Sequence, residues 1–145
     1  MKIITRKEKR EQFKKINLFE EFNKIRSHFF KDFNKILKRV KDSRHQSYID
    51  YTPDIILFSL LMKNVTSIES MNQMTTKFNT DECINNVARV LGCEGLEELP
   101  HHDTINNFLK KLKPGEIEKI RSYMIRELFK KRCLERYRLS DKYWK

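Results

Sequence analysis

The stretch that decides the fold is TPDIILFSLLM, which runs from Thr52 to Met62. Thr52 is a residue type that caps helices, and Pro53 is suited to the first position inside one. From Ile55 to Met62 the residues are apolar on nearly every side of such a helix, because only Ser59 interrupts the run. The sequence therefore predicts a helix over residues 53–62 that is the most enclosed element of the protein. Ile55, Ile56, Phe58, Leu60 and Leu61 are expected to be among the most buried residues.

Before this stretch, apolar residues recur at steps of three and four positions across residues 18–40. Such spacing is typical of one face of a helix and predicts a single helix of roughly six turns. The stripe consists of Leu18, Phe22, Ile25, Phe29, Phe33, Ile36 and Val40. A row of lysines on the other side is either a solvated face or a face that meets phosphates: Lys24, Lys31, Lys35 and Lys38. A charged lead-in over residues 5–16 is expected to be helical too, and residues 42–51 to form a loop.

Four more helices are expected after the central stretch. Residues 66–69, Thr-Ser-Ile-Glu, fit the capping box and predict a helix that continues to about Phe78. Asn79 or Thr80 is expected to cap the next helix, which Gly92 ends in the left-handed conformation. A helix over about 103–112 and a longer one over about 116–132 follow, separated by Lys-Pro-Gly at 113–115. The predicted fold class is all-α, a multi-helix bundle with a helix-turn-helix-like C-terminal half.

Composition supports this fold and narrows the class of protein. Only three glycines and three prolines occur in 145 residues, so few positions break a helix. No apolar run approaches the roughly 20 residues that span a bilayer, and the basic N-terminus lacks the apolar region of a secretory signal. Cys83, Cys93 and Cys133 are an odd number at wide spacing, which suits reduced thiols. We expect a cytoplasmic protein with no membrane partner.

The net charge of +11 is distributed unevenly along the chain. Residues 1–44 hold 15 Lys and Arg against 6 Asp and Glu, or +9, and residues 101–145 hold 13 against 6, or +7. The middle, residues 45–100, holds 3 against 8 and is acidic at −5. Two basic blocks of this size favour a polyanionic partner, because neutralised phosphates release counterions. The alternative is a charged surface that only keeps the protein soluble.

The densest cluster of polar residues is His101-His102-Asp103. Neighbouring residues on a helix point about 100° apart, so the two imidazoles are not expected to reach one metal ion. We interpret the cluster as a helix cap with surface histidines. Cys133 has a basic neighbour but no adjacent general base, and three glycines do not make a phosphate-binding loop. The sequence therefore predicts no catalytic residue, no metal and no cofactor in this chain.

The outward positions of residues 101–111 carry residue types that read DNA. Asn bonds adenine through two hydrogen bonds in the major groove, Thr and His donate or accept, and Lys contacts phosphate or guanine. A short helix, a tight turn and a longer basic helix also match a helix-turn-helix order. The predicted DNA-binding residues are His101, His102, Thr104, Asn106, Asn107, Lys110, Lys111, Arg121, Arg126, Lys130, Lys131 and Arg132. The alternative is an ordinary solvated helix that happens to carry Asn.

The sequence LPHHDTINNFLKKL, residues 99–112, resembles a segment of the DDE-type insertion-sequence transposases of bacteria. In that segment a proline is followed by a small residue, two variable positions and a threonine, and His101 departs from the small residue. The continuation KPGEIEKI, residues 113–120, and the basic helix after it are similar too. In the family this helical region precedes an RNase H-like catalytic domain, whose first aspartate follows an apolar strand.

The resemblance implies the N-terminal part of a transposase, which recognises the inverted repeats at the ends of its element. The implied partner is double-stranded DNA, with a homodimer as a further association, in the bacterial cytoplasm at the nucleoid. The expected organisation is a basic helical segment over 1–44, a DNA-binding domain over 45–136 and a linker over 137–145 towards the missing catalytic domain. The alternative function is a helical protein-interaction module that pairs through the Phe-rich first helix. On either interpretation the chain is no enzyme on its own.

Overall fold

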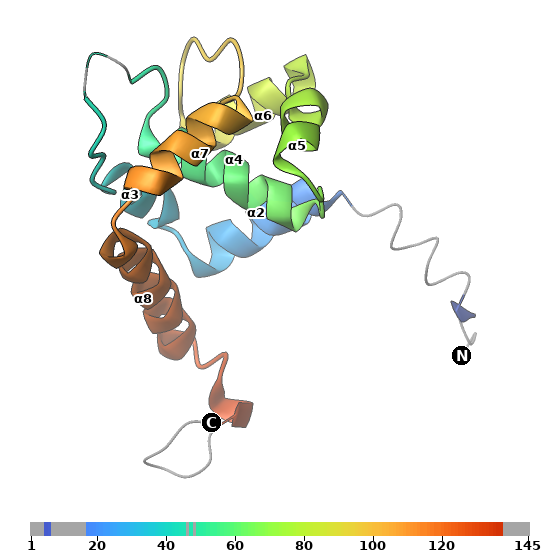
Figure 1. Cartoon of the computed structure of the whole chain (residues 1–145). Coiled ribbons are helices and arrows are strands. Elements are labelled where there is room, and N and C mark those ends of the chain that lie inside the picture. The colour runs from blue at the N-terminus through green and yellow to red at the C-terminus, as the bar shows by residue number, and fades with distance from the viewer. Residues whose placement is uncertain (1–4, 7–16, 46, 48, 138–145) are drawn as a thin grey trace.

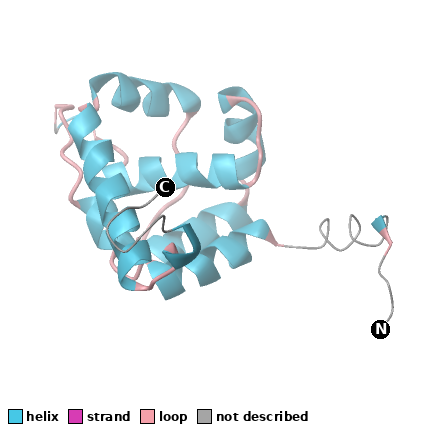
Figure 2. Cartoon of the chain, turned by 90° about the horizontal axis from the view of Figure 1, so that it is seen from below, coloured by secondary structure: helices cyan, strands magenta, loops and turns pink. Residues whose placement is uncertain are grey.

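In a computed structural model, the chain is described over residues 5–6, 17–45, 47 and 49–137. Every regular element in these ranges is helical, as Figure 2 shows, so the predicted all-α, multi-helix fold is confirmed. Nearly all of the expected helix over 5–16 and of the linker over 137–145 lies outside the described residues. The elements are α2 (Leu18–Phe29), α3 (Phe33–Lys38), α4 (Pro53–Val65), α5 (Met71–Phe78), α6 (Asp81–Leu91), α7 (His102–Lys111), α8 (Pro114–Lys130) and a 3-10 turn, η2 (Glu135–Tyr137).

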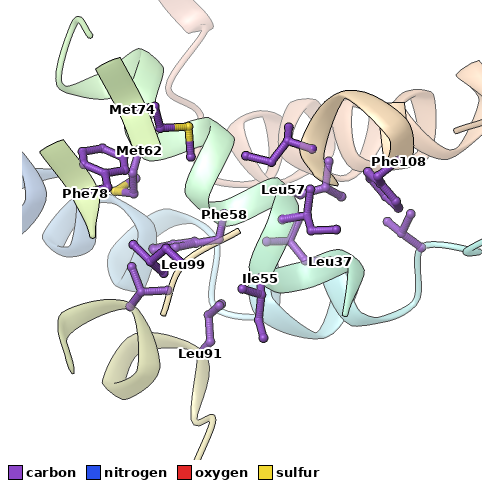
Figure 3. Packing of buried hydrophobic residues seen from close by; sticks show 14 of the residues in the cluster. Leu37, Ile55, Leu57, Phe58, Met62, Met74, Phe78, Leu91, Leu99 and Phe108 are labelled. Atoms are coloured by element: carbon purple, nitrogen blue, oxygen red, sulfur yellow. The ribbon is translucent and has the colours of Figure 1, made fainter. Parts of the chain in front are cut away.

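Helix α4 lies at the centre of the packing, as its all-round apolar sequence predicted. Ile56, Phe58 and Ser59 have no exposed surface, and Ile55 is 8% exposed. Leu60 and Leu61 are only half-buried, because α2, α3 and α6 pack on the other sides of α4. Side chains from α3, α5, α6 and α7 surround α4 in Figure 3 and form one hydrophobic cluster with it.

The prediction of a single helix over residues 18–40 is wrong, because the chain breaks between Phe29 and Phe33. The break turns α3 along α4, which buries Phe30 and Leu37 beside Phe33. Ile25, which the continuous stripe placed inward, is 51% exposed. The described part of residues 1–44 therefore shares its core with the residues after it, and its phenylalanines pack inside this chain.

Helix caps account for the start of α5 and for both ends of α6. The capping box predicted at residues 66–69 does not form, because α4 continues to Val65 and the Thr66 hydroxyl donates to the Met62 carbonyl at 2.8 Å. Ser70 caps α5 instead, and its hydroxyl accepts from the Gln73 N–H at 3.0 Å. Thr80 caps α6 and Gly92 ends it at φ +67°, both as predicted. Thr52 precedes α4 but makes no side-chain capping bond.

The C-terminal half consists of α7, which packs against α5, and α8, which leaves the body of the protein at a steep angle (Figure 1). Helix α5 lies at one end of the body and α8 at the other, while the end of α6 contacts α3 through a 2.6 Å hydrogen bond from Asn34 to the Val90 carbonyl. Helix α8 contributes only partly buried apolar side chains to the core, among them Ile120 and Met124. Across the described ranges, no helix combines the length and the apolar character needed to cross a bilayer.

Candidate nucleic-acid interface

Helix α7 has one buried face and one polar face. Ile105 and Phe108 are 0% and 1% exposed and fix the inner side of the helix. At about 100° per residue, Asn107 and Lys110 then lie opposite that side, and both are exposed. Thr104 and Asn106 lie on the two flanks and are half-buried. The outer face of α7 is thus centred on Asn107, which makes it the most accessible of the three predicted base-reading residues.

The polar groups at this face are available to a partner. Thr104, Asn106 and Asn107 make no side-chain hydrogen bond to another residue within the described ranges. Lys110 and Lys111 are exposed at the end of the same helix, where the Ser43 hydroxyl donates to the Lys111 carbonyl at 2.8 Å. An amide side chain without an internal partner can give both its donor and its acceptor to a base edge.

An ion pair between Asp42 and Arg44 packs against the buried face of α7 and helps to fix the position of the helix. The Arg44 guanidinium lies 5.1 Å from the centre of the Phe108 ring and also donates to Asp42 at 2.6 Å. Burial would raise the pKa of Asp42, but the hydrogen bonds from Arg44 outweigh it, so the pKa lies below its usual value. Both side chains are about nine-tenths enclosed, which makes this a rigid support for the exposed face.

Both histidines at the start of α7 make contacts within the chain, although His101 is exposed. His101 caps the helix, and its Nδ1 accepts from the Asp103 N–H at 3.3 Å, as the interpretation of a helix cap predicted. His102 is half-buried against α5, with Nδ1 at 3.2 Å from the Thr75 hydroxyl. The expected divergence of the two imidazoles is wrong: His101 has extended dihedral angles rather than helical ones, and the ring centres lie 4.0 Å apart.

The predicted basic residues of α8 fall on different sides of the helix. Arg121 and Arg126 are five positions apart, or about 140° around the axis. Arg121 donates two hydrogen bonds to Glu118, at 2.8 and 2.9 Å. Lys130 forms an ion pair with Glu127 at 2.6 Å, whereas Arg126 has no salt bridge to any described residue. The structure therefore brings Arg126 and Lys130 together and leaves Arg121 apart.

Arg126 and Lys130 line a cleft between α3 and α8 with a volume of about 390 Å³, which we call the α3–α8 cleft. Its lining residues are Asp32, Lys35, Ile36, Arg39, Tyr123, Arg126, Glu127 and Lys130. Lys35 belongs to the lysine row whose role the sequence left open. Arg39 was missed, because no pattern in the sequence distinguishes it from the other basic residues of the first block. Only the packing of α8 against α3 places it opposite Arg126.

Lys131 and Arg132 are not among the residues that line this cleft. The Lys131 ammonium lies 5.7 Å from the centre of the Phe29 ring, where it makes a cation–π contact with α2. Arg132 follows the end of α8 with a positive φ of 54° and is exposed. Both residues remain at the surface near the C-terminal end of α8, but neither adds to the α3–α8 cleft.

Two polar contacts fix the two walls of the cleft to each other. The Tyr123 hydroxyl accepts from the Asp32 N–H at 3.0 Å, and the Glu116 carboxylate accepts from the Lys41 N–H at 3.1 Å. Hydrogen bonds from Lys119 and from the Lys41 backbone hold the pKa of Glu116 below its usual value. The carboxylate is thus charged and engaged at neutral pH, which keeps the start of α8 beside the end of α3.

The described chain therefore offers two neighbouring polar surfaces of positive character, the outer face of α7 with Lys110 and Lys111, and the α3–α8 cleft. Asp32 and Glu127 also line the cleft, and Asp81 and Glu82 lie at the start of α6. No protein-family model, no curated protein and no solved structure matches this chain.

Proposed function

We propose that this chain binds double-stranded DNA, as the end-recognising N-terminal part of a transposase. The observation that carries the proposal is the placement of Arg39 and Arg126 on opposite walls of the α3–α8 cleft. Neither guanidinium forms a salt bridge with a described residue, although Asp32 lies close enough to Arg39 to interact electrostatically. Two guanidinium groups from different helices suit a phosphate, which accepts paired hydrogen bonds from each fork.

The lysines of the cleft add positive charge, and a phosphate can replace their present carboxylate partners with little loss of free energy. Lys35 pairs with Asp32 at 2.8 Å and Lys130 with Glu127 at 2.6 Å, and both lysine side chains are more than half exposed. Exposed pairs of this kind stabilise a protein by only about 0–1 kcal/mol. A phosphate can therefore compete for either lysine, and the cleft provides up to four cationic groups.

The outer face of α7 supplies the groups that read bases. Asn107 is exposed at its centre, with the half-buried Thr104 and Asn106 beside it. Phosphate contacts position a protein on DNA, whereas contacts to base edges specify the sequence. The cleft and the helix face therefore have separate roles in the proposed complex. The assignment to transposition rests on the resemblance of residues 99–132 to insertion-sequence transposases.

The alternative function, a protein-interaction module that pairs through the Phe-rich segment, has less to support it. Phe30 and Phe33 are buried in the core of this chain, at 8% and 3% exposure. Phe22 is half-buried and its ring contacts Phe58 of α4, at 6.2 Å between ring centres. Little aromatic surface therefore remains for another protein. A homodimer stays a prediction, and the exposed apolar residues that could serve it include Leu18 and Ile25 of α2 and Ile117 and Ile125 of α8.

Fluorescence anisotropy on labelled duplexes tests the proposal. With four phosphate contacts, raising the salt from 50 to 200 mM should weaken binding about a hundredfold. Arg39→Ala and Arg126→Ala should each weaken binding to every duplex and reduce the slope of log affinity against log salt by about one. Arg89→Ala is the matched control, because Arg89 is an exposed arginine on α6 that does not line the α3–α8 cleft. Binding that is absent at low salt, or equally weakened by all three variants, would refute the proposal.

A further inference from the structure

We propose that His101, His102 and Asp103, at the start of α7, form a site for a divalent transition-metal ion such as Zn²⁺. One ligand atom from each residue lies within 4.8 Å of the others. The site is distinct from the α3–α8 cleft and from Lys110 and Lys111, which lie at the opposite end of α7. The inference does not depend on DNA binding.

The distances between the ligand atoms suit a metal of this class. His101 Nδ1 lies 3.4 Å from one carboxylate oxygen of Asp103, and His102 Nε2 lies 3.6 Å from the other. Zinc binds nitrogen and oxygen at about 2.0–2.2 Å in a tetrahedral arrangement, which places neighbouring ligand atoms roughly 3.3–3.6 Å apart. The two contacts go to different oxygens of Asp103, so a rotation of this exposed carboxylate is needed to bring one oxygen within reach of both nitrogens.

The hydrogen bonds around the cluster leave acceptor atoms facing one another. His101 Nδ1 accepts from the Asp103 N–H, so this nitrogen carries a lone pair rather than a proton. When His102 Nδ1 donates to the Thr75 hydroxyl, 3.2 Å away, its Nε2 also carries a lone pair. Both lone pairs then lie beside a carboxylate, which only accepts. A bound cation would take both lone pairs, and at His101 Nδ1 it would replace the hydrogen bond from the Asp103 N–H.

Thr75 holds the His102 side chain in place by hydrogen bonds, as residues next to metal ligands commonly do. A metal-binding imidazole usually donates its other N–H to an oxygen, which fixes both the tautomer and the ring orientation. The Thr75 hydroxyl also accepts from the His102 backbone N–H at 3.2 Å, so two contacts hold this residue against α5. His102 is thus oriented before any ion arrives, while His101 and Asp103 are exposed and can move towards an ion once the capping bond of His101 is released.

The donor set defines the class of metal. Two imidazole nitrogens and one carboxylate oxygen favour Zn²⁺, Ni²⁺, Co²⁺ or Cu²⁺ over Mg²⁺ and Ca²⁺, which prefer sites made of oxygen alone. Three protein ligands leave a fourth position for water or for a group from a partner. The positive end of the α7 dipole opposes a cation here, and the Asp103 carboxylate offsets it. We therefore expect weaker binding than at a structural site with four ligands.

NMR titration of the full chain with ZnCl₂ tests the site, with calorimetry for stoichiometry. We expect one ion per chain, with shift changes concentrated at residues 101–103 and at Thr75. His101→Ala and Asp103→Asn change exposed side chains, so both variants should fold and should weaken binding at least tenfold. Thr75→Val should weaken it roughly 10- to 100-fold, and Thr75→Ser, which keeps the hydroxyl, should restore it.

His28→Ala is the matched control, because His28 is an exposed histidine on α2 and should not affect zinc binding. Calorimetry with MgCl₂ in place of ZnCl₂ should give no binding at residues 101–103. Zinc affinity that is unchanged in both His101→Ala and Asp103→Asn would overturn the proposal. Shift changes centred on Cys83, Cys93 or Cys133 would overturn it as well, since they would place the ion at thiols.

Discussion

The hydroxyl of Tyr123 accepts a hydrogen bond of 3.0 Å from the backbone N–H of Asp32, 91 residues earlier in the chain. This contact joins α8 to the start of α3, and the ring of Tyr123 also packs against Phe30, at 6.4 Å between ring centres. Burial raises the pKa of the Tyr123 hydroxyl, so it stays protonated and neutral at physiological pH. The two walls that carry Arg39 and Arg126 are therefore fixed to each other by a tyrosine at the floor of the cleft.

Removing the Tyr123 hydroxyl should lower the affinity for DNA and reduce the stability of the fold only slightly. Tyr123→Phe keeps the ring but leaves the Asp32 N–H without its partner, which should cost about 0.5–1.5 kcal/mol in the free energy of unfolding. Because the walls are then less well fixed, affinity for duplex DNA should fall. Urea unfolding and anisotropy measure the two effects. Ser122→Ala, a neighbouring loss of a hydroxyl, is the control, and equal loss of affinity in both variants would contradict this role of Tyr123.

The carboxylate of Glu116 should make stability depend on acid pH. Hydrogen bonds from Lys119 and from the Lys41 backbone lower the pKa of Glu116 in the folded protein. Its contribution is therefore fully present above the unfolded pKa of about 4.3, and it is lost as the pH falls through the lower folded pKa. Glu116→Gln should flatten the decline in stability below about pH 4.3, as thermal melts at several pH values measure. A variant with the unchanged acid profile would exclude this contribution.

Removing the buried hydroxyl of Ser59 should stabilise the protein. Its hydroxyl is fully buried in α4 and has no hydrogen-bond partner within the described residues. Leaving a hydroxyl unsatisfied in the core costs roughly 1–3 kcal/mol, and Ala is also the better helix former. Ser59→Ala should therefore raise the free energy of unfolding by about 1 kcal/mol in urea. A decrease in stability would show that the hydroxyl has a partner in solution, such as an enclosed water.

The described fold follows from local patterns in the sequence, and the errors arise where two patterns compete. The apolar run of α4, the cap at Thr80 and the left-handed Gly92 depend on neighbouring residues alone and were predicted. The spacing over residues 18–40 fits one helix equally well as two. The outcome depends on packing against α4, which buries Phe30 and Leu37 and which no local pattern contains.

The candidate site also has one part that local sequence patterns predict and another that depends on packing. The polar face of α7 could be predicted, because a periodic helix exposes what its apolar residues leave uncovered. The α3–α8 cleft could not, since Arg39 and Arg126 lie far apart in the sequence and meet only through the packing of α8. The paired imidazoles were missed for a local reason. His101 occupies the cap position, where the dihedral angles are extended and the angular spacing of helical residues does not apply.

The break between α2 and α3 predicts a graded series of core mutants. Phe33 is 3% exposed, and Phe33→Ala should cost roughly 3–5 kcal/mol in the free energy of unfolding. Phe29 is half-buried, so Phe29→Ala should cost less than Phe33→Ala. Ile25 is 51% exposed, and Ile25→Ala should cost within about 0.5 kcal/mol. Urea titration ranks the three variants. A loss of unfolding free energy in Ile25→Ala as large as that in Phe33→Ala would instead support a single continuous helix.

The separation of roles between α7 and the α3–α8 cleft can be tested by comparing specific with random DNA. Asn107 is exposed at the centre of the outer face of α7 and has no internal hydrogen bond among the described residues. On a duplex selected from a randomised pool, Asn107→Ala should cost about 1–3 kcal/mol of binding energy, because a pair of hydrogen bonds to one base is lost. On scrambled duplex the same variant should bind as the wild type does, since a neutral side chain contributes little to phosphate binding.

Arg126→Ala should behave in the opposite manner and weaken both complexes alike. Asn85→Ala, at an exposed asparagine of α6, is the matched control and should change neither affinity. Anisotropy at two salt concentrations distinguishes these outcomes, and equal loss on both duplexes for Asn107→Ala would reduce α7 to a helix that contacts only the DNA backbone.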